Sequence, residues 1–598
     1  MTAETGAEKS PYLGVASSLI GKRWLMGDCD ERLGLALAQR LQLPDVVARI
    51  LSSRGVDLDT AASFLDPKLR DLLPDPSRFK DMDKAAERIT SAVMQNEQIA
   101  VFGDYDVDGA TSSALFSRFI NAVGGRIRTY IPDRMKEGYG PNAKALQNLK
   151  DSGVSVVLTV DCGTLAFDAL AAAEKSGLDV IVADHHAPGA SLPACVAVIN
   201  PNRLDEQPGY GHLAAVGVVF LLIIAINRLL RSMDWYDDRI EPDLMGWLDI
   251  VALGTVCDVV PLNALNRAFV TQGLKVMAAR GNAGIRAVSE IAGIHETPGT
   301  YHAGFVIGPR INAGGRLGSS ELGARLLSTD DMDEALSIAQ KLDGFNQERR
   351  DVEAIVLEQA ITNVDKIEAG SHAMVLASGT GWHPGVIGIV ASRLKERYNR
   401  PACVVAFDNE TGLGVGSGRS VTGVDLGASI LAATQAGLLV KGGGHAMAAG
   451  FTVALDKLDE LRTFLNDRIG SIITDQKIVP TLHVDASLAL SGVTPTLITK
   501  LDQIGPFGSG NPEPRFVIPD VSIQYAAVAG TDHVRLTLMD SAGSKRQAIC
   551  FRCMDNPLGP ELLNAGGKSF HIAGKIRLNN WQGRSTAQIQ IEDAVPVW

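Results

Sequence analysis

The chain has 598 residues, of which 46% are hydrophobic and 21% charged, with a formal net charge of −12. This length excludes a single hydrophobic core and predicts roughly three or four domains, and the composition excludes a disordered or fibrous chain. The acidic balance argues against a uniformly phosphate-binding surface. Locally grouped basic residues and bound divalent metal would still allow a nucleic-acid partner.

Two features bear on location. The seven cysteines are scattered and the chain starts without a signal-peptide pattern, which predicts a reducing cytoplasm. The longest apolar run, residues 213–226, falls short of the roughly 20 residues that a membrane-spanning helix needs. We therefore expect a buried core helix there and no membrane partner.

In chain order, residues 1–84 are predicted to form a helical lead-in that packs on the next domain. From residue 85 to 329, short β-rich runs alternate with helices of about ten residues, which predicts a parallel sheet covered on both faces. The expected strands are 99–102, 127–131, 154–160 and 180–183, and the expected helices are 111–122, 141–150 and 165–175. This pattern indicates an α/β fold.

A polar helix over 330–367 is predicted to connect this domain to a second α/β domain at 368–475. The second domain has expected strands at 374–377 and 403–407 and a helix that starts near Gly385. The final part, 476–598, changes to short alternating runs separated by Gly, Asp and Asn turns, which predicts a small β-barrel.

Carboxylates follow several of the predicted parallel strands. Three alternate in Asp104-Tyr105-Asp106-Val107-Asp108-Gly109, another stands in Val160-Asp161-Cys162-Gly163, and a fourth group is Asp184-His185-His186. Ligands of open α/β sheets bind beyond the carboxyl ends of the strands. An aspartate after one strand is an ordinary helix cap or turn former. Their recurrence at successive strand ends instead favours a metal site.

The predicted ligands are four carboxylates and one imidazole: Asp106, Asp108, Asp161, His185 and Asp258. Asp258 follows a helical stretch, within Gly254-Thr255-Val256-Cys257-Asp258-Val259-Val260-Pro261. This donor set suits Mn²⁺ or Mg²⁺ rather than a thiolate-bound zinc. Because so many carboxylates repel one another, two cations are expected, an arrangement that is typical of phosphodiester hydrolysis.

These motifs resemble those of the DHH phosphoesterases, in particular the RecJ single-strand-specific exonucleases. The resemblance runs over about residues 24–598 and is carried by further motifs: 131–134, 137–140, 308–316, 382–388, 416–420 and 442–446. It implies a DHH catalytic domain, a connecting helix, a DHH-associated α/β domain and an OB-fold barrel. It also implies an exonuclease that degrades single-stranded DNA from the 5′ end to mononucleotides in DNA repair and recombination.

The resemblance also implies roles for individual residues. Asp106 and Asp161 would hold one metal, with Asp104 nearby as a ligand or a supporting group. The other metal would be held by Asp108, Asp161, His185 and Asp258, so that Asp161 bridges the two ions. His186 would face the scissile phosphate as a charge stabiliser or proton donor.

Six residues are predicted to bind phosphate or DNA: Arg134, Arg310, Arg316, Ser417, Arg419 and His445. A lone arginine in a loop is as readily a surface or interface ion pair. Within RecJ-like motifs, Arg316, Ser417 and Arg419 would form a 5′-phosphate pocket, with Arg134 along its path. Residues 442–445 are predicted to open a helix whose N-terminus favours an anion. The barrel would bind single strands, and single-strand-binding protein is a candidate partner.

Three other functions are considered. One is an oligonucleotide (nanoRNase) or cyclic-dinucleotide phosphodiesterase, another is a non-catalytic scaffold like the helicase-associated relatives, and the third is a type II inorganic pyrophosphatase. The first and the third function do not account for the predicted barrel at residues 476–598. The second is disfavoured because all five expected ligands are intact in the sequence.

Overall fold

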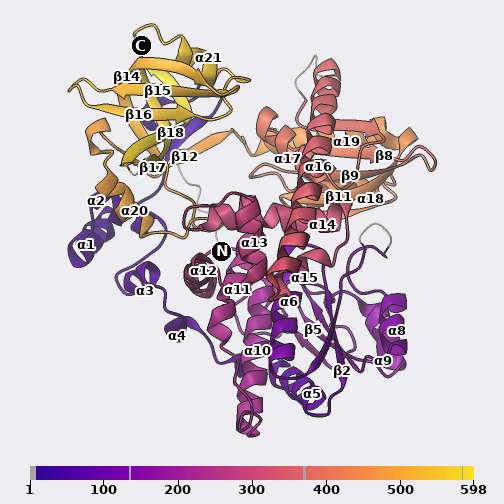
Figure 1. The fold of residues 1–598 in the computed structure, drawn as a ribbon. Coiled ribbons are helices and arrows are strands. Elements are labelled where there is room, and N and C mark those ends of the chain that lie inside the picture. Colours follow the sequence, from indigo (N-terminus) through magenta and orange to yellow (C-terminus); the bar gives the residue numbers. More distant parts are fainter. Residues whose placement is uncertain (1–8, 134–136, 368–371, 582–583, 598) are drawn as a thin grey trace. The chain divides into compact units, whose positions relative to one another are not determined.

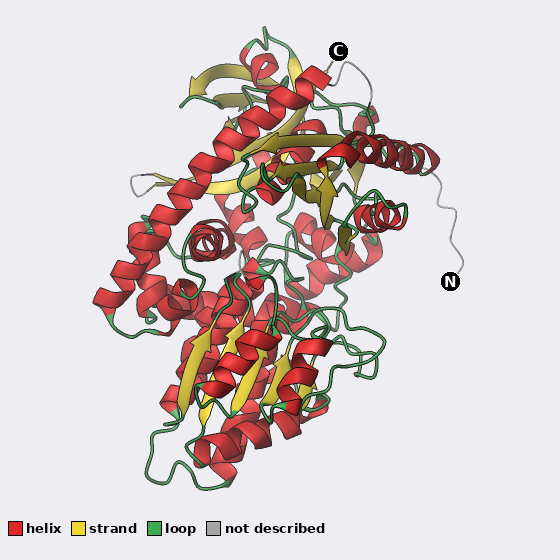
Figure 2. Ribbon diagram, turned by 90° about the vertical axis from the view of Figure 1, so that its right-hand side faces the viewer, coloured by secondary structure: helices red, strands yellow, loops and turns green. Residues whose placement is uncertain are grey.

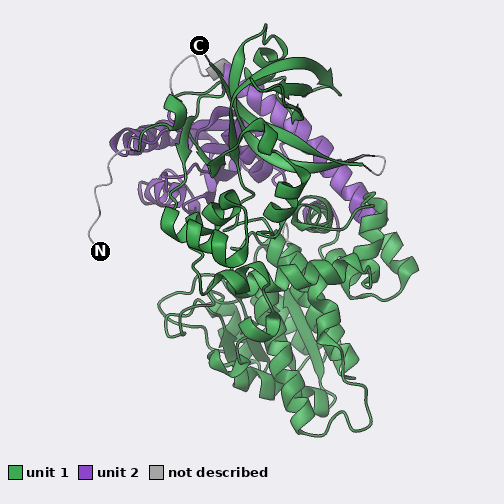
Figure 3. Cartoon of the chain, turned by 90° about the vertical axis from the view of Figure 1, so that its left-hand side faces the viewer, with its two compact units in different colours: residues 1–315, 319–340, 481–598 green, residues 316–318, 341–480 purple. Residues whose placement is uncertain are grey.

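The computed structural model describes residues 9–133, 137–367, 372–581 and 584–597. The chain divides into two compact units (Figure 3). The first comprises residues 1–315, 319–340 and 481–598, and the second comprises residues 316–318 and 341–480. Helix α16, Met332–Ile367, starts in the first unit and continues into the second.

The first unit contains a five-stranded parallel sheet with the order β3-β2-β4-β5-β6 (Figures 1 and 2). Its strands are β2 Gln98–Gly103, β3 Arg126–Tyr130, β4 Val156–Val160, β5 Asp179–Ala183 and β6 Ala197–Ile199. The predicted α/β fold with a parallel sheet is confirmed. The central strand β4 is buried along its whole length, as expected for a sheet with helices on both faces.

Helices cover both faces of this sheet. On one face α8 Ala143–Asp151 and α9 Phe167–Lys175 share a core with the strands. On the other lie α5 Met82–Met94, α6 Val107–Ala122 and α10 Ala215–Ser232. Because all five strands are parallel, their carboxyl ends meet at one edge of the sheet.

Helix α10 is long and apolar enough to cross a membrane by length and composition alone. However, 72% of it is buried inside the protein, where it packs against α5 and α6. It therefore has the character of the core helix that the sequence predicts.

Further helices follow the sheet in the chain: α11 Leu248–Cys257, α12 Ala264–Ala278, α13 Ala283–Ile291, the π-helix η4 His302–Ile307, α14 Gly308–Leu317 and α15 Leu322–Ser328. They belong to the first unit, except for the last two residues of α14, which are assigned to the second. Of these, α11 packs on α6, α10, α12 and η4. It therefore links the acidic edge of the sheet to the helices that follow it in the chain.

The C-terminal part of the first unit is a closed five-stranded barrel, which confirms the predicted OB-fold. Its strands pair in the order β14-β15-β16-β18-β17, and β17 closes on β14. They are β14 Phe516–Ala529, β15 His533–Met539, β16 Lys545–Cys550, β17 Ser569–Trp581 and β18 Arg584–Val597. Helix α21, Leu558–Leu563, lies between β16 and β17 in the chain.

The N-terminal segment packs largely on this barrel. Strand β1, Arg23–Met26, pairs in parallel with β12, Thr481–Val484. Helices α1 Glu31–Leu41 and α2 Asp45–Ser53 share one hydrophobic core with the barrel strands. The expectation of a lead-in that packs on the next domain is therefore incomplete, because pairing between distant segments leaves no local signal in the sequence.

The second unit has a five-stranded mixed sheet with the order β10-β11-β9-β8-β7. Its strands are β7 Val375–Thr380, β8 Ala402–Phe407, β9 Leu413–Arg419, β10 Lys441–His445 and β11 Ala448–Ala454. Only β7 and β8 are parallel. Its helices are α17 Ile387–Tyr398, α18 Leu426–Gln435 and α19 Leu458–Asp475.

The prediction that residues 442–445 open a helix is wrong, because they lie in strand β10. Glycine costs roughly 1 kcal/mol per residue in a helix interior, so three in succession disfavour one. Here Gly442 allows close packing of α18, since a Cβ on it would lie 2.7 Å from Ile430 Cγ2. A Cβ on Gly427 would lie 2.8 Å from the carbonyl carbon of Gly444.

One buried arginine joins three parts of the first unit. Arg267 of α12 is 1% exposed, and its guanidinium lies 3.8 Å from the centre of the Phe64 ring. It donates to the carbonyls of Phe64 (2.7 Å) and Ile504 (2.9 Å), and also to that of Gly505. Burial lowers the pKa of Arg267 to about 10. This one side chain therefore ties the N-terminal segment and the segment before the barrel to helix α12.

We expect Arg267→Met to destabilise the first unit by about 3 kcal/mol, since it leaves three carbonyl groups without their charged donor. Urea unfolding followed by circular dichroism measures the change. Arg286→Met is the matched control, because the exposed pair Arg286–Glu290 contributes about 0.5 kcal/mol or less. Equal midpoints for the two variants would contradict this role of Arg267.

Candidate metal centre and phosphate-binding residues

The first group of carboxylates lies in the turn between β2 and α6. Asp106 is the N-cap of α6, and its Oδ1 accepts hydrogen bonds from the backbone N–H groups of Asp108 (2.9 Å) and Gly109 (3.1 Å). A Cβ on Gly109 would overlap the backbone of Asp104. Glycine at 109 therefore lets the helix start directly beneath Asp104, which is 4% exposed.

Asp108 is fully buried in the first turn of α6. Its two oxygens accept from the backbone N–H groups of Ala215 (2.6 Å) and Val216 (3.0 Å) at the start of α10. The N-terminus of a helix carries a partial positive charge, which stabilises this carboxylate. Position 254 of α11 is glycine, and a Cβ there would lie 3.1 Å from Asp108 Oδ1.

Asp161 follows β4 directly and has a left-handed backbone conformation, with φ of 60°. Only a few per cent of non-glycine residues adopt such angles, mostly Asn and Asp, and they concentrate at functional sites. Gly163 continues the turn with φ of 112°, and a Cβ there would lie 2.6 Å from Thr159 Oγ1. Asp161 itself is 2% exposed at the carboxyl end of the sheet.

The Asp184-His185-His186 turn follows β5 and is organised by Asp184. Its Oδ1 accepts from the backbone N–H groups of His185 (2.8 Å) and His186 (3.2 Å) and lies 2.7 Å from His186 Nδ1. Its Oδ2 accepts from the Thr164 N–H at 3.1 Å. Asp184 therefore positions both histidines.

Two asparagines that sequence reasoning missed complete this turn. The Asn200 side chain donates to the carbonyl of His186 (2.9 Å) and to Thr164 Oγ1 (3.0 Å). The Asn202 side chain donates to the carbonyl of His185 at 2.5 Å. Both follow strand β6 and therefore stand, like the aspartates, just after the end of a parallel strand. However, an amide after one short strand is common in turns, so the sequence alone did not point to a function.

Asp258 lies at the C-cap of α11, and the structure brings it to the same edge. His185 Nε2 is 3.3 Å from Asp161 Oδ1, 3.5 Å from Asp258 Oδ2 and 3.9 Å from Asp108 Oδ2. Three overlapping groups have ligand atoms within 4.8 Å of one another: Asp104 with Asp106 and Asp161, Asp108 with His185 and Asp258, and Asp161 with His185 and His186. The predicted ligands and the predicted catalytic residues Asp104, Asp161 and His186 thus lie together.

Burial and mutual repulsion dominate the electrostatics of this edge. Burial, reinforced by Asp106, raises the pKa of Asp108 to about 7, and burial with repulsion from Asp108 raises that of Asp258 to about 9. The pKa of Asp161 is also raised, by burial and by four neighbouring carboxylates. Burial and the neighbouring His186 lower the pKa of His185 to about 4. A group of acids that resist ionisation together is suited to bind cations.

The histidines differ in their surroundings. Burial opposes the charged form of His186, but its hydrogen bond to Asp184 outweighs this and raises its pKa. The same hydrogen bond helps to lower the pKa of Asp184 despite its burial. The surroundings therefore favour the charged form of His186, whereas they favour the neutral form of His185, the form in which imidazole binds a metal.

The side chains fit divalent metal ions. Among the described residues, His185 Nε2, Asp161 Oδ1 and Asp258 Oδ2 are buried and make no hydrogen bond. Buried polar atoms without partners are rare, and those at one point call for a bound group. Carboxylate oxygens with one imidazole nitrogen are the donors expected for Mn²⁺ or Mg²⁺.

A second cluster of predicted residues lies in the second unit, beside the first turn of α17. Arg419 donates to Ser417 Oγ at 3.2 Å and to the Gly418 carbonyl at 2.8 Å. A Cβ on Gly388, in that first turn, would lie 3.0 Å from Arg419 Nη2 and 3.1 Å from Ser417 Oγ. A guanidinium, a hydroxyl and a helix N-terminus are all groups that interact favourably with an anion.

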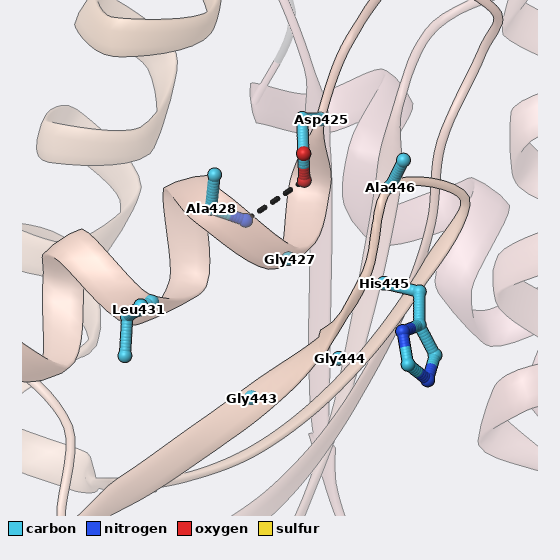
Figure 4. Close-up of a pocket in the computed structure, with 8 residues that line it drawn as sticks. All are labelled: Asp425, Gly427, Ala428, Leu431, Gly443, Gly444, His445 and Ala446. Carbon is cyan, nitrogen blue, oxygen red and sulfur yellow. Dashed lines mark hydrogen bonds between the residues drawn. The ribbon is translucent and has the colours of Figure 1, made fainter. Parts of the chain in front are cut away.

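His445 shares a sheet face with these residues. Arg419 is opposite Ala448 on β11, and Ala448 is opposite His445 on β10. Directly opposed residues present their side chains on the same face of a sheet. His445 is therefore on the face of Arg419, two strands away, at a distance of roughly 10 Å. Figure 4 shows its ring on the side of the strand away from Leu431 of α18.

The remaining predicted phosphate-binding residues have different settings. Arg310 of α14 lies in the first unit and donates to the Val306 carbonyl at 2.7 Å. Arg316 belongs to the second unit and donates to the Gly385 carbonyl at 2.5 Å, near the start of α17. Arg134 lies outside the described residues.

Comparisons with known proteins agree with this architecture. Three family models match: the DHH family, N-terminal domain, over residues 98–255; the DHHA1 domain over 370–471; and the RecJ OB domain over 484–593. The single-stranded-DNA-specific exonuclease RecJ of Dickeya dadantii is 35% identical, with 93% of this chain and 96% of that protein covered.

Two crystal structures of RecJ from Thermus thermophilus are also similar. The complex with Mn²⁺ matches with a TM-score of 0.77 and 28% identity, over 96% of this chain and 79% of that one. The complex with Mg²⁺ matches with a TM-score of 0.73 and 26% identity, over 96% and 78%. The parallel sheet, its acidic edge and the domains that follow define a DHH-type phosphoesterase architecture. Within that class, this chain belongs to the RecJ family.

We expect Asp161→Asn to abolish the thermal stabilisation that Mn²⁺ gives the wild-type protein. A ligand at 100 times its Kd stabilises the folded state by about 2.7 kcal/mol, and the amide supplies no charge. In EDTA the variant should melt at or above the wild-type temperature, because a repelled carboxylate is removed. Asp168→Asn, on the exposed first turn of α9, is the control. A full Mn²⁺ shift in Asp161→Asn would contradict its place in the centre.

Proposed function

We propose that this protein is a 5′-to-3′ exonuclease that hydrolyses single-stranded DNA to 5′-mononucleotides, with two Mn²⁺ or Mg²⁺ ions, in DNA repair and recombination. The proposal rests mainly on one observation. Five side chains lie close together at the carboxyl edge of a DHH-type sheet: Asp106, Asp108, Asp161, His185 and Asp258. Membership of the RecJ family supports single-stranded DNA as the substrate.

The metal site would be divided between two sets of residues. Asp104, Asp106 and Asp161 would hold one ion, and Asp108, Asp161, His185 and Asp258 would hold the other. When bound, the two ions supply a hydroxide nucleophile and stabilise the leaving oxygen of the phosphodiester. The backbone donors from α10 and α6 hold Asp108 and Asp106 in fixed orientations.

His186 would act on the phosphate rather than on a metal. Its Nδ1 is engaged by Asp184 at 2.7 Å, which fixes the ring and leaves Nε2 as the free donor atom. Its side chain is 44% exposed, in contrast to 12% for His185. A protonated Nε2 would donate to a phosphate oxygen and stabilise the negative charge that develops there.

The proposal includes three further points about the nuclease. It prefers a strand with a 5′ phosphate, single-strand-binding protein delivers that strand, and the protein acts in the cytoplasm. The cluster of Arg316, Ser417 and Arg419 supports the phosphate preference. All seven cysteines are free thiols, which supports a reducing compartment. The OB-type barrel supports a substrate longer than a dinucleotide, since such barrels bind several nucleotides.

Digestion of a long 5′-phosphorylated single strand labelled at its 3′ end tests the activity. We expect Mn²⁺-dependent, stepwise shortening of the labelled strand from its 5′ end, and a loss of roughly 1,000-fold or more in rate for Asp161→Ala, because neither ion would be held correctly. Binding of the strand in EDTA should change little. Cleavage of dinucleotides alone would instead indicate the smaller phosphodiesterase, and unchanged hydrolysis by the variant would exclude this centre.

We expect Arg419→Ala to reduce the preference for a 5′ phosphate over a 5′ hydroxyl by roughly tenfold or more, because a charge-assisted contact contributes about 1.5–3 kcal/mol. The measurement is kcat/KM on two strands that differ only in that group. Arg468→Ala, at an exposed position of α19, is the matched control. An unchanged preference in Arg419→Ala would place the phosphate elsewhere.

A further inference from the structure

Asp258 is held at the metal centre differently from two of the other acids. The carboxylates of Asp106 and Asp108 accept hydrogen bonds from backbone N–H groups of helices α6 and α10. Asp258 Oδ2 is buried, 3.5 Å from His185 Nε2, but it accepts no hydrogen bond from the residues that the structure describes. The place of Asp258 in the centre therefore depends on the course of the backbone at the end of α11.

The backbone directly after Asp258 has an unfavourable conformation. Val259 has φ of 62°, in the left-handed region, and is 68% exposed. For a β-branched residue such an angle is an outlier, and it persists only where neighbouring contacts enforce it. Because the side chain of Val259 is mostly exposed, its own packing does not supply these contacts. They must come from the residues that follow it.

A loop before the barrel contacts the residues that follow. This loop, residues 505–512, precedes strand β14 in the chain. The Leu262 N–H donates to the Ser509 carbonyl at 2.8 Å. Gly510 has φ of 69°, and a Cβ on it would lie 2.9 Å from Pro261 Cβ. The backbone of the loop therefore rests directly on the segment that continues from the strained valine.

The loop is itself closed by Asn511, which is 2% exposed. The Asn511 Nδ2 donates to the carbonyls of Ile504 (3.0 Å) and Pro506 (2.8 Å), and its Oδ1 accepts from Arg54. The Gly508 N–H donates to the Asn511 carbonyl at 2.9 Å. Every polar atom of this buried amide has a partner, and such a satisfied polar network holds a loop in one conformation.

The loop and helix α12 fix the same peptide group. Asn266 of α12 donates to the Pro261 carbonyl at 3.0 Å, while the loop accepts from the N–H of Leu262. Both polar groups of the peptide between residues 261 and 262 are therefore engaged. Asn266 also donates to the His212 carbonyl at 2.6 Å, just before α10. This peptide is thus tied to the helix that holds Asp108 and to the loop.

We propose that loop 505–512 is a positioning element for Asp258. The loop holds the segment that enforces the strained turn at Val259, so that the carboxylate of Asp258 stays beside His185. It acts through residues 261 and 262. The inference rests on the two-metal function proposed above and deepens it. It makes the affinity for the ion at Asp258 depend on residues that lie far along the chain.

Hydrogen exchange of the wild-type protein, with and without Mn²⁺, is the first test. A ligand that holds Asp258 in place must, by linkage, also stabilise the contacts that position it. We expect Mn²⁺ to slow exchange of the Leu262 amide and of the amides of residues 505–512 by roughly fivefold or more. The amides of the barrel turn at Gly530 should not change. Unchanged exchange in both Leu262 and the loop would overturn the proposal.

The second test is the Mn²⁺ affinity of Gly510→Ala, measured by electron paramagnetic resonance of the free ion. The added methyl group would push on Pro261 and so displace the turn after Asp258. We expect one of the two ions to bind roughly tenfold more weakly, as is usual when residues that orient a metal ligand are changed. The other ion should bind nearly as in the wild type. Asp258→Asn identifies which ion is affected.

Gly530→Ala is the matched control for Gly510→Ala. Gly530 has φ of 66°, but a Cβ there would have nothing within 4 Å. This variant therefore introduces the same backbone strain into the same unit without a contact to the turn. We expect it to bind both ions as the wild type does.

Val259→Gly separates positioning from general destabilisation. Glycine adopts positive φ without strain, so the turn would need less support and would absorb a displacement of Pro261. We expect Gly510→Ala to weaken Mn²⁺ binding less in the Val259→Gly protein than in the wild type. Independent destabilising changes would instead add.

Two results with these variants would overturn the positioning role. One is Mn²⁺ binding by Gly510→Ala that equals that of Gly530→Ala. The other is an equal weakening of both ions that Val259→Gly does not relieve. If Gly510→Ala does not fold, Gly508→Ala replaces it, because its Cβ would lie 2.7 Å from Leu262 Cδ1, the movable end of a side chain. A wild type that binds two Mn²⁺ ions but digests no strand would refute the nuclease function and leave the positioning role standing.

Discussion

The fold depends on one electrostatic constraint, which is that several acids are buried together at the end of a parallel sheet. Asp104, Asp108 and Asp161 are each less than 5% exposed, and Asp258 is close to them. Without cations, this arrangement keeps some of these carboxyl groups protonated and costs folding energy. Divalent ions would remove that cost, so folding stability and catalysis would depend on the same interaction.

Much of the surrounding structure holds these acids in place. The N-terminus of α10 supplies two backbone donors to Asp108, and Asp184 with two asparagines fixes the histidine turn. Glycines at 109 and 254 leave room where a side chain would push the elements apart. Such preorganisation places the charges before substrate arrives, which is where electrostatic catalysis gains most of its effect.

The sheet and its acidic edge were predictable because both depend on local signals. Buried parallel strands are continuous apolar runs, and Asp161 and Asp184 follow two of them directly. Other features depend on contacts between distant residues. Strand β1 pairs with β12 across most of the chain, and Gly442–Gly444 form a strand against α18 rather than a helix start.

The acidic composition is compatible with a polyanionic substrate because the acidic and basic side chains are grouped at different places in the protein. The carboxylates of the centre would be neutralised by two divalent ions, which would bring four positive charges to one site. Basic groups occur locally, as with Arg419 beside the start of α17, where we propose that the 5′ phosphate binds.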